Sequence, residues 1–412
     1  MDERIVITGF GAISSIGLNM AENWGNCTNG VSGLGPITLF DASELNVQVA
    51  CEIKGFEPAD YISPKKVRRM DRFEQLAVVA AKELLEHSGL EITEENGDRI
   101  GTVISSSAGG VQSLTDGIHT IIEKGPSRVS PFSTAMYMSN GAAGMTSIEY
   151  KSRGPSFSVE SACASGGDAI GVSWLLLKAG LVDAMITGSS EASITLVSVS
   201  GLDRSGAMSR NYGDPPIAPR PFDKTRDGFV IGEGVGLLTL EREGFARSRG
   251  ATIYAELAGY GSTSDAFHIT APLEDGSGAS KAIKNAVRNA RVDLNDVEYI
   301  NAHGTGTLLN DVSETRAIKQ VFGSRAYEVP ISATKSMTGH MLGATAALEV
   351  IFTAHSIYYG ILPPTINYRV PDPECDLDYT PNEAREKKVK IAISNSFGFG
   401  GHNSVLVLKA YS

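Results

Sequence analysis

The sequence has few cysteines and no long apolar run. Its four cysteines, Cys27, Cys51, Cys163 and Cys375, are scattered, and no two of them form a CxxC pair. This scarcity argues against a disulfide framework and against a zinc site. No apolar stretch is long enough to span a bilayer, and no signal peptide is visible at the start of the chain. We therefore expect a cytoplasmic protein with no membrane partner.

Positive charge is also scarce. The 412-residue chain carries 36 Lys and Arg against 47 Asp and Glu, which gives a formal net charge of −11. An acidic surface argues against nucleic acid as the general partner, although it does not exclude a local basic patch. Glycine, in contrast, is abundant at 45 residues, beside 42% hydrophobic residues. This composition suits a large soluble globular enzyme with many tight turns, and the length suits either two to three domains or one large α/β unit.

The chain is organised around residues 155–167, which include Cys163. Ser156 to Val159 mixes small and β-branched residues, as a buried strand does, and residues 164–178 are apolar with glycines at the start, as in a helix packed on several sides. Cys163 therefore falls near a helix N-terminus, where free N–H groups and the helix dipole favour a thiolate. A buried structural cysteine is the alternative interpretation of this stretch alone.

Strands and helices alternate through both halves of the chain. Strands are predicted at 4–9, 99–105, 182–188, 230–241, 253–260, 297–302, 329–333, 388–395 and 404–408. Helices are predicted at 20–29, 136–150, 164–178, 279–290, 312–322 and from about 341 to 359, and the segment 63–89 is predicted to be a turn followed by a long amphipathic helix. The succession of strand, small-residue turn and apolar helix at 156–178 recurs at 329–359. This echo predicts two halves with parallel sheets that bring the two turns together.

Three of the seven histidines lie in settings unlike a surface position. His303 follows a predicted strand in a loop of small residues, and His340 closes the second turn, which also carries Lys335. His268 lies in a loop between glycine-rich segments. His87 and His355, in contrast, have the surroundings of ordinary helix residues.

Several motifs occur in a fixed order along the whole chain. They are a lone Cys163, His-Gly-Thr-Gly-Thr at 303–307, Lys-Ser-Met-Thr-Gly-His at 335–340 and Asn-Ser-Phe-Gly-Phe-Gly-Gly-His-Asn at 395–403, together with Arg-Pro-Phe-Asp at 220–223 and Asp-Gly-Phe-Val at 227–230. In this set the chain resembles the β-ketoacyl-acyl carrier protein synthases. Within that family it is similar to the synthase II branch and to type II polyketide ketosynthases.

The resemblance implies a thiolase-like α/β fold of five layers, αβαβα, from two pseudo-repeated halves, 1–251 and 252–412. It also implies a catalytic centre of Cys163, His303 and His340, and a decarboxylative Claisen condensation. Cys163 would hold an acyl chain as a thioester, and malonyl-acyl carrier protein would lose carbon dioxide and extend it by two carbons, giving a 3-oxoacyl-acyl carrier protein. Such an acyltransferase binds no cofactor of its own, because the carrier protein supplies phosphopantetheine.

Further roles follow from the same resemblance. The histidines would donate N–H groups to the malonyl thioester oxygen, and the backbone N–H groups of Cys163 and Phe399 would form an oxyanion hole. Lys335 would tune His340, with an ion pair to Glu314 or Asp311 as the alternative. Phe399 resembles a gate for arriving acyl groups, because the glycines on both sides permit its backbone to swing.

Substrate contacts are implied at further positions. Thr270, Thr305, Thr307 and Gly400 match such positions, and so does His268, for which a structural hydrogen bond is the alternative. No metal takes part in the implied chemistry. A structural cation stays open, because four positions match a place where some relatives hold one: Asn301, Glu349, Ser394 and Asn395.

Basic residues gather in one region of an otherwise acidic protein. They are Lys65, Lys66, Arg68 and Arg69, with Arg128 further along the chain. Because carrier proteins are acidic, this basic group predicts a docking patch for acyl carrier protein. A solvated helix end is the alternative interpretation.

The chain departs from the synthase II pattern at the expected acyl tunnel. Gly306 replaces the usual serine, as in many polyketide ketosynthases, and Ala108, Ser133 and Leu202 are smaller than the usual residues. These changes predict a wide tunnel, unless neighbouring side chains compensate. The Phe399 loop points back to synthase II, so fatty acid and polyketide biosynthesis both stay open.

Two other functions compete with the condensing enzyme. A thiolase-like acyltransferase would need a second catalytic cysteine near the C-terminus, and Cys375 lies outside the closing glycine motif. A chain-length factor, which is a silent partner subunit, would lack the nucleophile that Cys163 provides. Family members are dimers, so we expect either a homodimer or a heterodimer with a chain-length factor.

Overall fold

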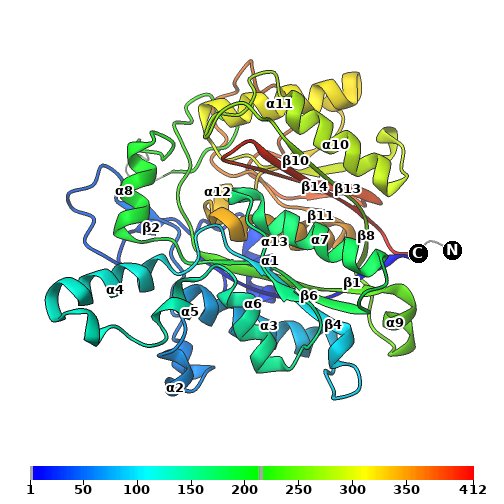
Figure 1. Ribbon diagram of the computed structural model, residues 1–412. Coiled ribbons are helices and arrows are strands. Elements are labelled where there is room, and N and C mark those ends of the chain that lie inside the picture. The colour runs from blue at the N-terminus through cyan, green and yellow to red at the C-terminus, as the bar shows by residue number, and fades with distance from the viewer. Residues whose placement is uncertain (1–2, 212, 214–216) are drawn as a thin grey trace.

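The fold is built on one large sheet that bends into two halves. A computed structural model describes residues 3–211, 213 and 217–412 (Figure 1). The strands of the first half-sheet are β1 (Ile5–Ser14), β4 (Ile100–Ser105), β5 (Ser156–Phe157), β6 (Ala184–Glu191) and β7 (Gly234–Arg242). Those of the second are β8 (Ala255–Ser264), β9 (Tyr299–Asn301), β10 (Ile331–Ser332), β13 (Ile391–Gly398) and β14 (His402–Lys409).

The pairing of these strands makes the sheet mixed. Its order is β10-β9-β13-β14-β8-β1-β7-β6-β4-β5, and β1 meets β8 through the pairs Val6 with Glu256 and Ile7 with Ala255. The outer strands β4, β5 and β6 run parallel, as do β9, β10 and β13, whereas β7 and β14 are antiparallel to their neighbours. The prediction of parallel sheets is therefore wrong for the inner strands. The turn 399–401 between β13 and β14 is too short for a crossover and permits only an antiparallel pair.

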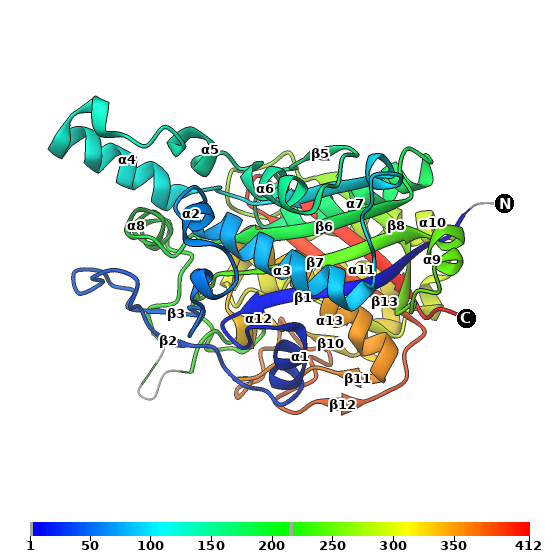
Figure 2. The ribbon, with the colours of Figure 1, turned by 90° about the horizontal axis from the view of Figure 1, so that it is seen from below.

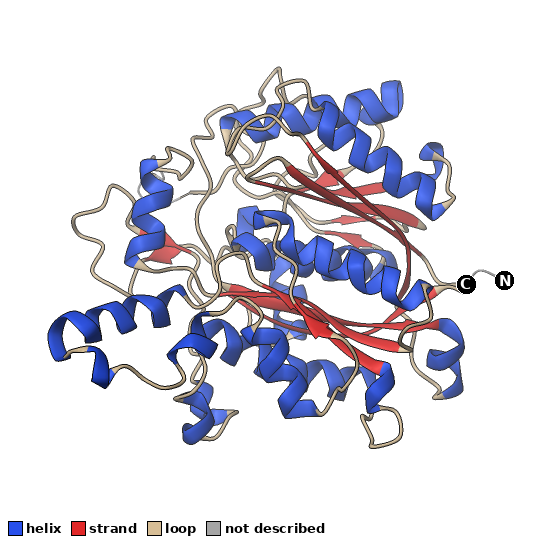
Figure 3. Cartoon of the chain, in the orientation of Figure 1, coloured by secondary structure: helices blue, strands red, loops and turns tan. Residues whose placement is uncertain are grey.

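Helices complete the five layers (Figures 1 and 3). In the middle, between the half-sheets, lie α7 (Ser165–Lys178) and α13 (Thr345–Tyr359). The outer layers are α3 (Arg72–Ser88) with α6 (Gly141–Tyr150) on one side and α10 (Ser277–Ala290) with α11 (Leu308–Phe322) on the other. The predicted αβαβα arrangement is thus confirmed. Helices cover both faces of β1, which explains why all of its residues are buried without polar alternation.

Shorter elements connect the layers and surround the sheet. The helices are α1 (Met20–Thr28), α2 (Pro64–Val67), α4 (Val111–Lys124), α5 (Ser133–Tyr137), α8 (Leu196–Arg204), α9 (Glu243–Ser248) and α12 (Lys335–Thr338). The strands are β2 (Gly35–Pro36), β3 (Val49–Ala50), β11 (Ile361–Leu362) and β12 (Arg385–Glu386). Among the described residues, no helix is long and apolar enough to cross a membrane.

One predicted helix is confirmed and another is interrupted. The long helix predicted after a turn within 63–89 is α3, and the short α2 lies in the segment before it. Asp71 caps α3 by accepting from the Phe73 N–H, while the Glu74 carboxylate accepts from the Asp71 N–H. The segment 136–150 divides into the end of α5 and α6. The predicted buried strand at Ser156 is also shorter than expected, and Ser156 is exposed because β5 is an edge strand.

Helix α4 was missed by the sequence analysis and lies outside the layers. None of its residues is buried, and Figure 2 shows it extending from one end of the molecule. Its apolar residues Leu114, Ile118, Ile121 and Ile122 are exposed. An apolar stripe on an uncovered helix is a feature of surfaces that bind another protein.

The middle layer gives a test of packing at Gly166. A Cβ on this residue of α7 would lie 2.9 Å from both the Ala347 nitrogen and the Gly343 oxygen. We therefore expect Gly166→Ala to lower the free energy of unfolding by about 1–3 kcal/mol, measured by urea denaturation. The control Gly25→Ala, where a Cβ meets nothing within 4 Å, should raise it by up to about 1 kcal/mol. A Gly166 variant as stable as the wild type would contradict this packing.

Candidate active site

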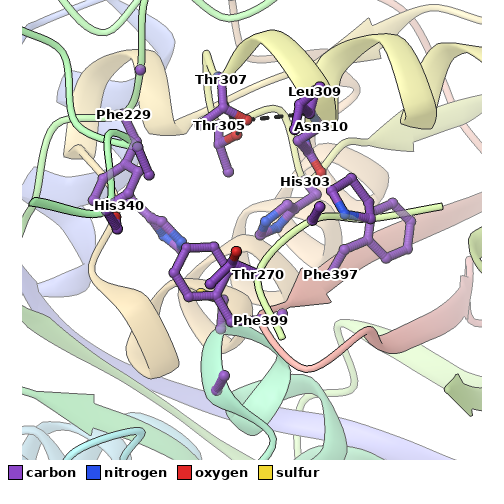
Figure 4. A pocket seen from close by; sticks show the side chains of 18 of the residues that line it. Phe229, Thr270, His303, Thr305, Thr307, Leu309, Asn310, His340, Phe397 and Phe399 are labelled. Carbon is purple, nitrogen blue, oxygen red and sulfur yellow. Dashed lines mark hydrogen bonds between the residues drawn. The ribbon is translucent and has the colours of Figure 1, made fainter. Parts of the chain in front are cut away.

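A cavity of about 520 Å³ lies where the two halves of the chain meet. Cys163, His303 and His340, which are far apart in the sequence, all line it. Figure 4 shows the two imidazole rings pointing into one space beside Phe399. The fold thus brings together the three residues that the sequence singled out for catalysis.

Cys163 is held on a tight turn in front of α7. The turn Ala162–Ala164 starts with a left-handed φ of 53° at Ala162, a conformation that costs a residue with a Cβ about 1–2 kcal/mol. Ser165 stabilises the turn, because its hydroxyl accepts from the Ser161 N–H at 2.9 Å and donates to the Ala162 oxygen at 2.7 Å. The strained turn presents Cys163 to the cavity.

The end of β13 approaches this turn closely. A Cβ on Gly398 would lie 2.6 Å from the Ser161 oxygen and 3.1 Å from the Cys163 nitrogen. Glycine at 398 therefore permits the backbone of Phe399 to reach the cysteine. The N–H groups of Phe399 and of Cys163 itself are both directed to the sulfur.

The pKa of Cys163 differs from the expectation based on the helix N-terminus. Burial raises the pKa to about 11, and this effect exceeds the lowering by the Phe399 N–H and by the positive charge of Lys335. Cys163 is partly exposed through the cavity, so solvent there offsets part of the desolvation. Burial therefore opposes the predicted preference for a thiolate, which stays a prediction.

The two histidines share the cavity as neutral rings. Their ring centres are 5.5 Å apart with an interplanar angle of 84°. Burial lowers the pKa of both well below the ordinary value, and the charge of Lys335 lowers both further. Neutral imidazoles can donate an N–H to an oxygen on which negative charge develops.

Backbone hydrogen bonds fix the position of each histidine. The N–H groups of His303 and Gly304 donate to Glu314 at 2.9 and 2.8 Å. The N–H of His340 donates to the Val230 oxygen at 2.7 Å. Both rings therefore belong to loops that are held firmly by buried partners.

Lys335 is buried between the histidine loops and α13. Its Nζ donates to the His303 oxygen at 2.5 Å and to the Glu349 carboxylate at 2.8 and 2.9 Å. The predicted partners, Glu314 and Asp311, are therefore wrong: Glu314 holds the His303 loop, and Asp311 lies 3.6 Å from Arg226. The actual partner comes from the following helix. Burial raises the pKa of Glu349 to about 7, and Lys335 opposes that shift.

The loop with Phe399 is joined to a second loop at the entrance. Gly400 and Gly401 have left-handed φ values of 85° and 73°. The Gly400 N–H donates to the Ile269 oxygen at 2.7 Å, and the Asp265 N–H donates to the Gly401 oxygen at 2.8 Å. A movement of Phe399 by rotation at these glycines therefore disturbs both loops.

The threonines and His268 occupy different places around the entrance. Thr270, Thr305 and Thr307 line the cavity, and the hydroxyls of Thr305 and Thr307 lie 2.9 Å apart. His268 is exposed and does not line it; its Nδ1 accepts from the N–H groups of Thr270 and Ala271, both at 3.1 Å. For His268 the structure has the hydrogen bond that was the alternative to a substrate contact.

The three predicted tunnel positions are not brought together in the single chain. Leu202 on α8 lines the cavity, but Ala108 and Ser133 do not. Ala108 is exposed in the loop before α4, and Ser133 starts α5. These two residues lie beside the uncovered apolar surface of α4.

Sequence analysis missed the aromatic walls. Phe229 meets His340 edge-on at 5.3 Å between ring centres, and Phe397 lies 5.7 Å from His303. Both stand in the motifs that carry the resemblance, each beside a glycine, so their place in a motif was the available signal. Both contribute to the desolvation of the histidines.

Some of the basic residues near α2 already interact with other side chains of this chain. Lys65, Arg68 and Arg128 are exposed. Lys66 forms an ion pair with Glu149 at 2.5 Å, and the Arg69 guanidinium lies 4.6 Å above the Phe132 ring. Within the described part of the chain, no cluster of three His, Cys, Asp or Glu residues could hold a metal ion.

Comparison with known proteins places the chain among condensing enzymes. Residues 2–246 match the family described as Beta-ketoacyl synthase, N-terminal domain, and residues 254–369 match Beta-ketoacyl synthase, C-terminal domain. The 3-oxoacyl-acyl-carrier-protein synthase 2 of Staphylococcus aureus is 47% identical over 410 residues, covering 100% of this chain and 99% of that protein. The Synechocystis enzyme of the same name is 47% identical over 409 residues, covering 99% and 98%.

Solved structures agree over the full length. The ishigamide ketosynthase/chain length factor has a TM-score of 0.92 and 36% identity, with 100% of both chains covered. A type II polyketide acyl-carrier protein in complex with its ketosynthase, AntDE:AntF, has a TM-score of 0.92 and 33% identity, also with 100% of both chains covered.

The buried ion pair gives a test of histidine protonation. Lys335→Met removes a positive charge that lowers the pKa of His303 and His340. Both pKa values should then rise, so the rings gain protons at a higher pH. We expect the acid limb of the pH–rate profile to move up by roughly one pH unit. The control Lys319→Met, at the surface pair with Asp376, should leave the limb in place. An unmoved limb in Lys335→Met would contradict the electrostatic role of this lysine.

Proposed function

The chain belongs to the β-ketoacyl synthase family, and on that premise we propose how its residues perform the reaction. The protein is an acyltransferase that elongates an acyl chain by decarboxylative Claisen condensation, in fatty acid or polyketide biosynthesis. The observation that carries the residue assignment is the meeting of Cys163 with two neutral histidines in one desolvated cavity.

In the first half-reaction, Cys163 takes the acyl chain. The sulfur attacks the thioester carbon of an acyl-carrier protein, the bond to the pantetheine sulfur breaks, and the cysteine proton ends on that leaving sulfur. The N–H groups of Cys163 and Phe399, both directed to this place, stabilise the oxyanion of the tetrahedral intermediate. The raised pKa of the thiol means that attack is coupled to loss of its proton.

In the second half-reaction, His303 and His340 bind the malonyl thioester oxygen. As the bond to the carboxylate breaks, carbon dioxide leaves and the electron pair forms an enolate, which the two N–H groups stabilise. The enolate carbon attacks the Cys163 thioester, and the thiolate leaves as the new carbon–carbon bond forms. Each charged intermediate thus has its own preorganised donors.

The remaining assigned residues position these groups. Lys335 keeps the histidines neutral by its charge and holds the His303 loop by its bond to the His303 oxygen. Thr270, Thr305 and Thr307 bind the pantetheine arm that the carrier protein supplies, and the chain needs no cofactor of its own. Phe399 is the gate, and Gly400 is its hinge. No metal takes part in the reaction.

The partner of the reaction is acyl carrier protein, which docks on Lys65, Arg68, Arg69 and Arg128. Exposure of Lys65, Arg68 and Arg128 supports this placement, as does the likeness to a ketosynthase described in complex with its carrier protein. Arg69 contributes to the charge of the patch while it stacks on Phe132. We also propose a cytoplasmic location, in keeping with the relatives named 3-oxoacyl-acyl-carrier-protein synthase 2.

The working unit is a dimer, either of two copies or with a chain-length factor. The uncovered apolar stripe of α4 and the exposed edge strand β5 support such a contact. A partner there would also cover Ala108 and Ser133, which complete the acyl tunnel with Leu202. The halves 1–251 and 252–412 are two copies of one folding unit, in keeping with half-sheets that each draw strands from one half only.

Substitution at the nucleophile and at the histidines separates the two half-reactions. Cys163→Ala should abolish acylation by acyl-carrier protein, measured as an acyl mass on the peptide with residue 163, whereas the control Cys375→Ala should keep it. His303→Ala and His340→Ala should retain acylation but lower carbon dioxide release from malonyl-carrier protein about a hundredfold to a thousandfold.

The outcome also distinguishes the competing functions. Acylation from coenzyme A thioesters without decarboxylation would indicate a thiolase-like acyltransferase. Lack of any acylation in the wild type would indicate a silent partner subunit.

The docking patch is tested by charge reversal. Lys65→Glu combined with Arg68→Glu should raise the KM for acyl-carrier protein about tenfold, because repulsion replaces attraction to an acidic partner. Alkylation of Cys163 by a small reagent should not change. The control Lys281→Glu reverses an exposed charge on α10, in the opposite outer layer, and should leave the KM as it is. Normal carrier-protein kinetics in the double variant would contradict the placement.

A further inference from the structure

Two turns of the same shape lead into the central helices. The turn Ala162–Ala164 precedes α7, and the turn Leu342–Ala344 precedes α13. The first residue of each has a left-handed φ, 53° at Ala162 and 47° at Leu342. The second residue is Cys163 in one turn and Gly343 in the other. Gly343 is therefore the structural counterpart of the nucleophile.

The strands that end beside these turns also correspond. β13 ends at Gly398 and β6 ends at Glu191, and each strand has 8 residues. A Cβ on Gly398 would lie 3.1 Å from the Cys163 nitrogen, and a Cβ on Gly343 would lie 3.0 Å from Glu191 Oε2. The catalytic turn thus faces a glycine, whereas its counterpart faces a carboxylate.

Glu191 is fully buried and accepts four hydrogen bonds. The N–H and hydroxyl of Ser107 donate to its Oε2 at 2.7 and 2.6 Å. The hydroxyls of Ser106 and Ser193 donate to its Oε1 at 3.3 and 2.5 Å. Ser106 in turn accepts from the Gly109 N–H at 2.9 Å. Four donors suit an ionised carboxylate, which only accepts, and they oppose the rise in pKa that burial causes.

We propose that Glu191 is a positioning residue for the acyl channel: it occupies the counterpart of the catalytic site and holds the wall segment Ser106–Gly109 against the central turns. Ser107 lines the same cavity as Cys163, and Ala108 follows it directly. The carboxylate acts on the acyl chain through this wall. Its negative charge also raises the pKa of the Cys163 thiol, an effect on the sulfur that does not depend on the length of the acyl chain. The inference rests on the proposed function, because the wall matters only when Cys163 carries an acyl chain.

The consequence is a preference for chain length that depends on Glu191. Glu191→Ala leaves the half-buried Ser107 N–H without its acceptor and releases the wall. Long acyl chains extend along the wall, so half-maximal acylation of Cys163 should then need about tenfold more donor thioester than in the wild type. For short chains the required concentration should rise less than about twofold. Acylation is followed by protein mass over a series of acyl-carrier proteins.

Glu191→Gln is the conservative variant. Its amide oxygen still accepts from Ser107, and its NH₂ group donates to Ser106 and Ser193, whose hydroxyls can rotate to accept. The donor concentration for half-maximal acylation is compared between long and short acyl chains. The ratio of these two concentrations should therefore stay within about twofold of the wild-type ratio. Rescue by glutamine shows that the charge of Glu191 does not set the preference. Ser107→Ala then separates the hydrogen bonds from the filled volume, because it removes a donor and leaves the side chain of residue 191 in place.

Two further variants keep the test decisive. Glu241→Ala removes an equally buried carboxylate on β7 that pairs with Arg249 outside the cavity, and it should not alter the ratio. If Glu191→Ala does not fold, Ser107→Ala removes one of the four donors and should shift the ratio in the same direction. An unchanged ratio in the variants of Glu191 and Ser107, or an equal loss for all chain lengths, overturns the inference. Failure of the wild type to acylate Cys163 would overturn the proposed function instead.

Discussion

Burial of the reactive side chains between the two halves is the constraint on which the whole site depends. Burial lowers the pKa of His303 and His340 and raises that of Cys163, so the imidazoles stay neutral and the thiol keeps its proton. Lys335 is a buried cation beside two neutral histidines, so it needs a nearby negative charge. The Glu349 carboxylate provides that charge. The same desolvation strengthens every hydrogen bond made to a charge that develops during the reaction.

The two halves contribute similar frames to this site, and they carry different residues. In each half a strained turn leads into a buried helix. Beside each turn lies the end of a strand from the other half. In one copy, Gly398 leaves space so that Phe399 and Cys163 come together. In the other, Glu191 fills the corresponding space, and Gly343 has no side chain. A symmetric frame thus carries a nucleophile on one side and a structural carboxylate on the other.

The surface of the single chain is less complete than its core. The helix α4 exposes an apolar stripe, and the loop before it carries Ala108 away from the cavity. The entrance is different, because Gly400 and Asp265 tie the two entrance loops to each other through backbone hydrogen bonds. The cavity with Cys163 and the two histidines is therefore built within one chain, whereas the predicted tunnel positions Ala108 and Ser133 lie outside it.

The sequence by itself determined the fold class and the membership of the site. Long apolar runs after small-residue turns predicted α7 and α13 as helices packed on several sides. The ordered motifs identified Cys163, His303 and His340 as the residues that the fold brings to one cavity. Only the tertiary structure decided the antiparallel inner strands, the pairing of Lys335 with Glu349, and the direction of the Cys163 pKa shift. These depend on contacts between segments far apart in the chain and on how much water they exclude, and neither is encoded in local pattern.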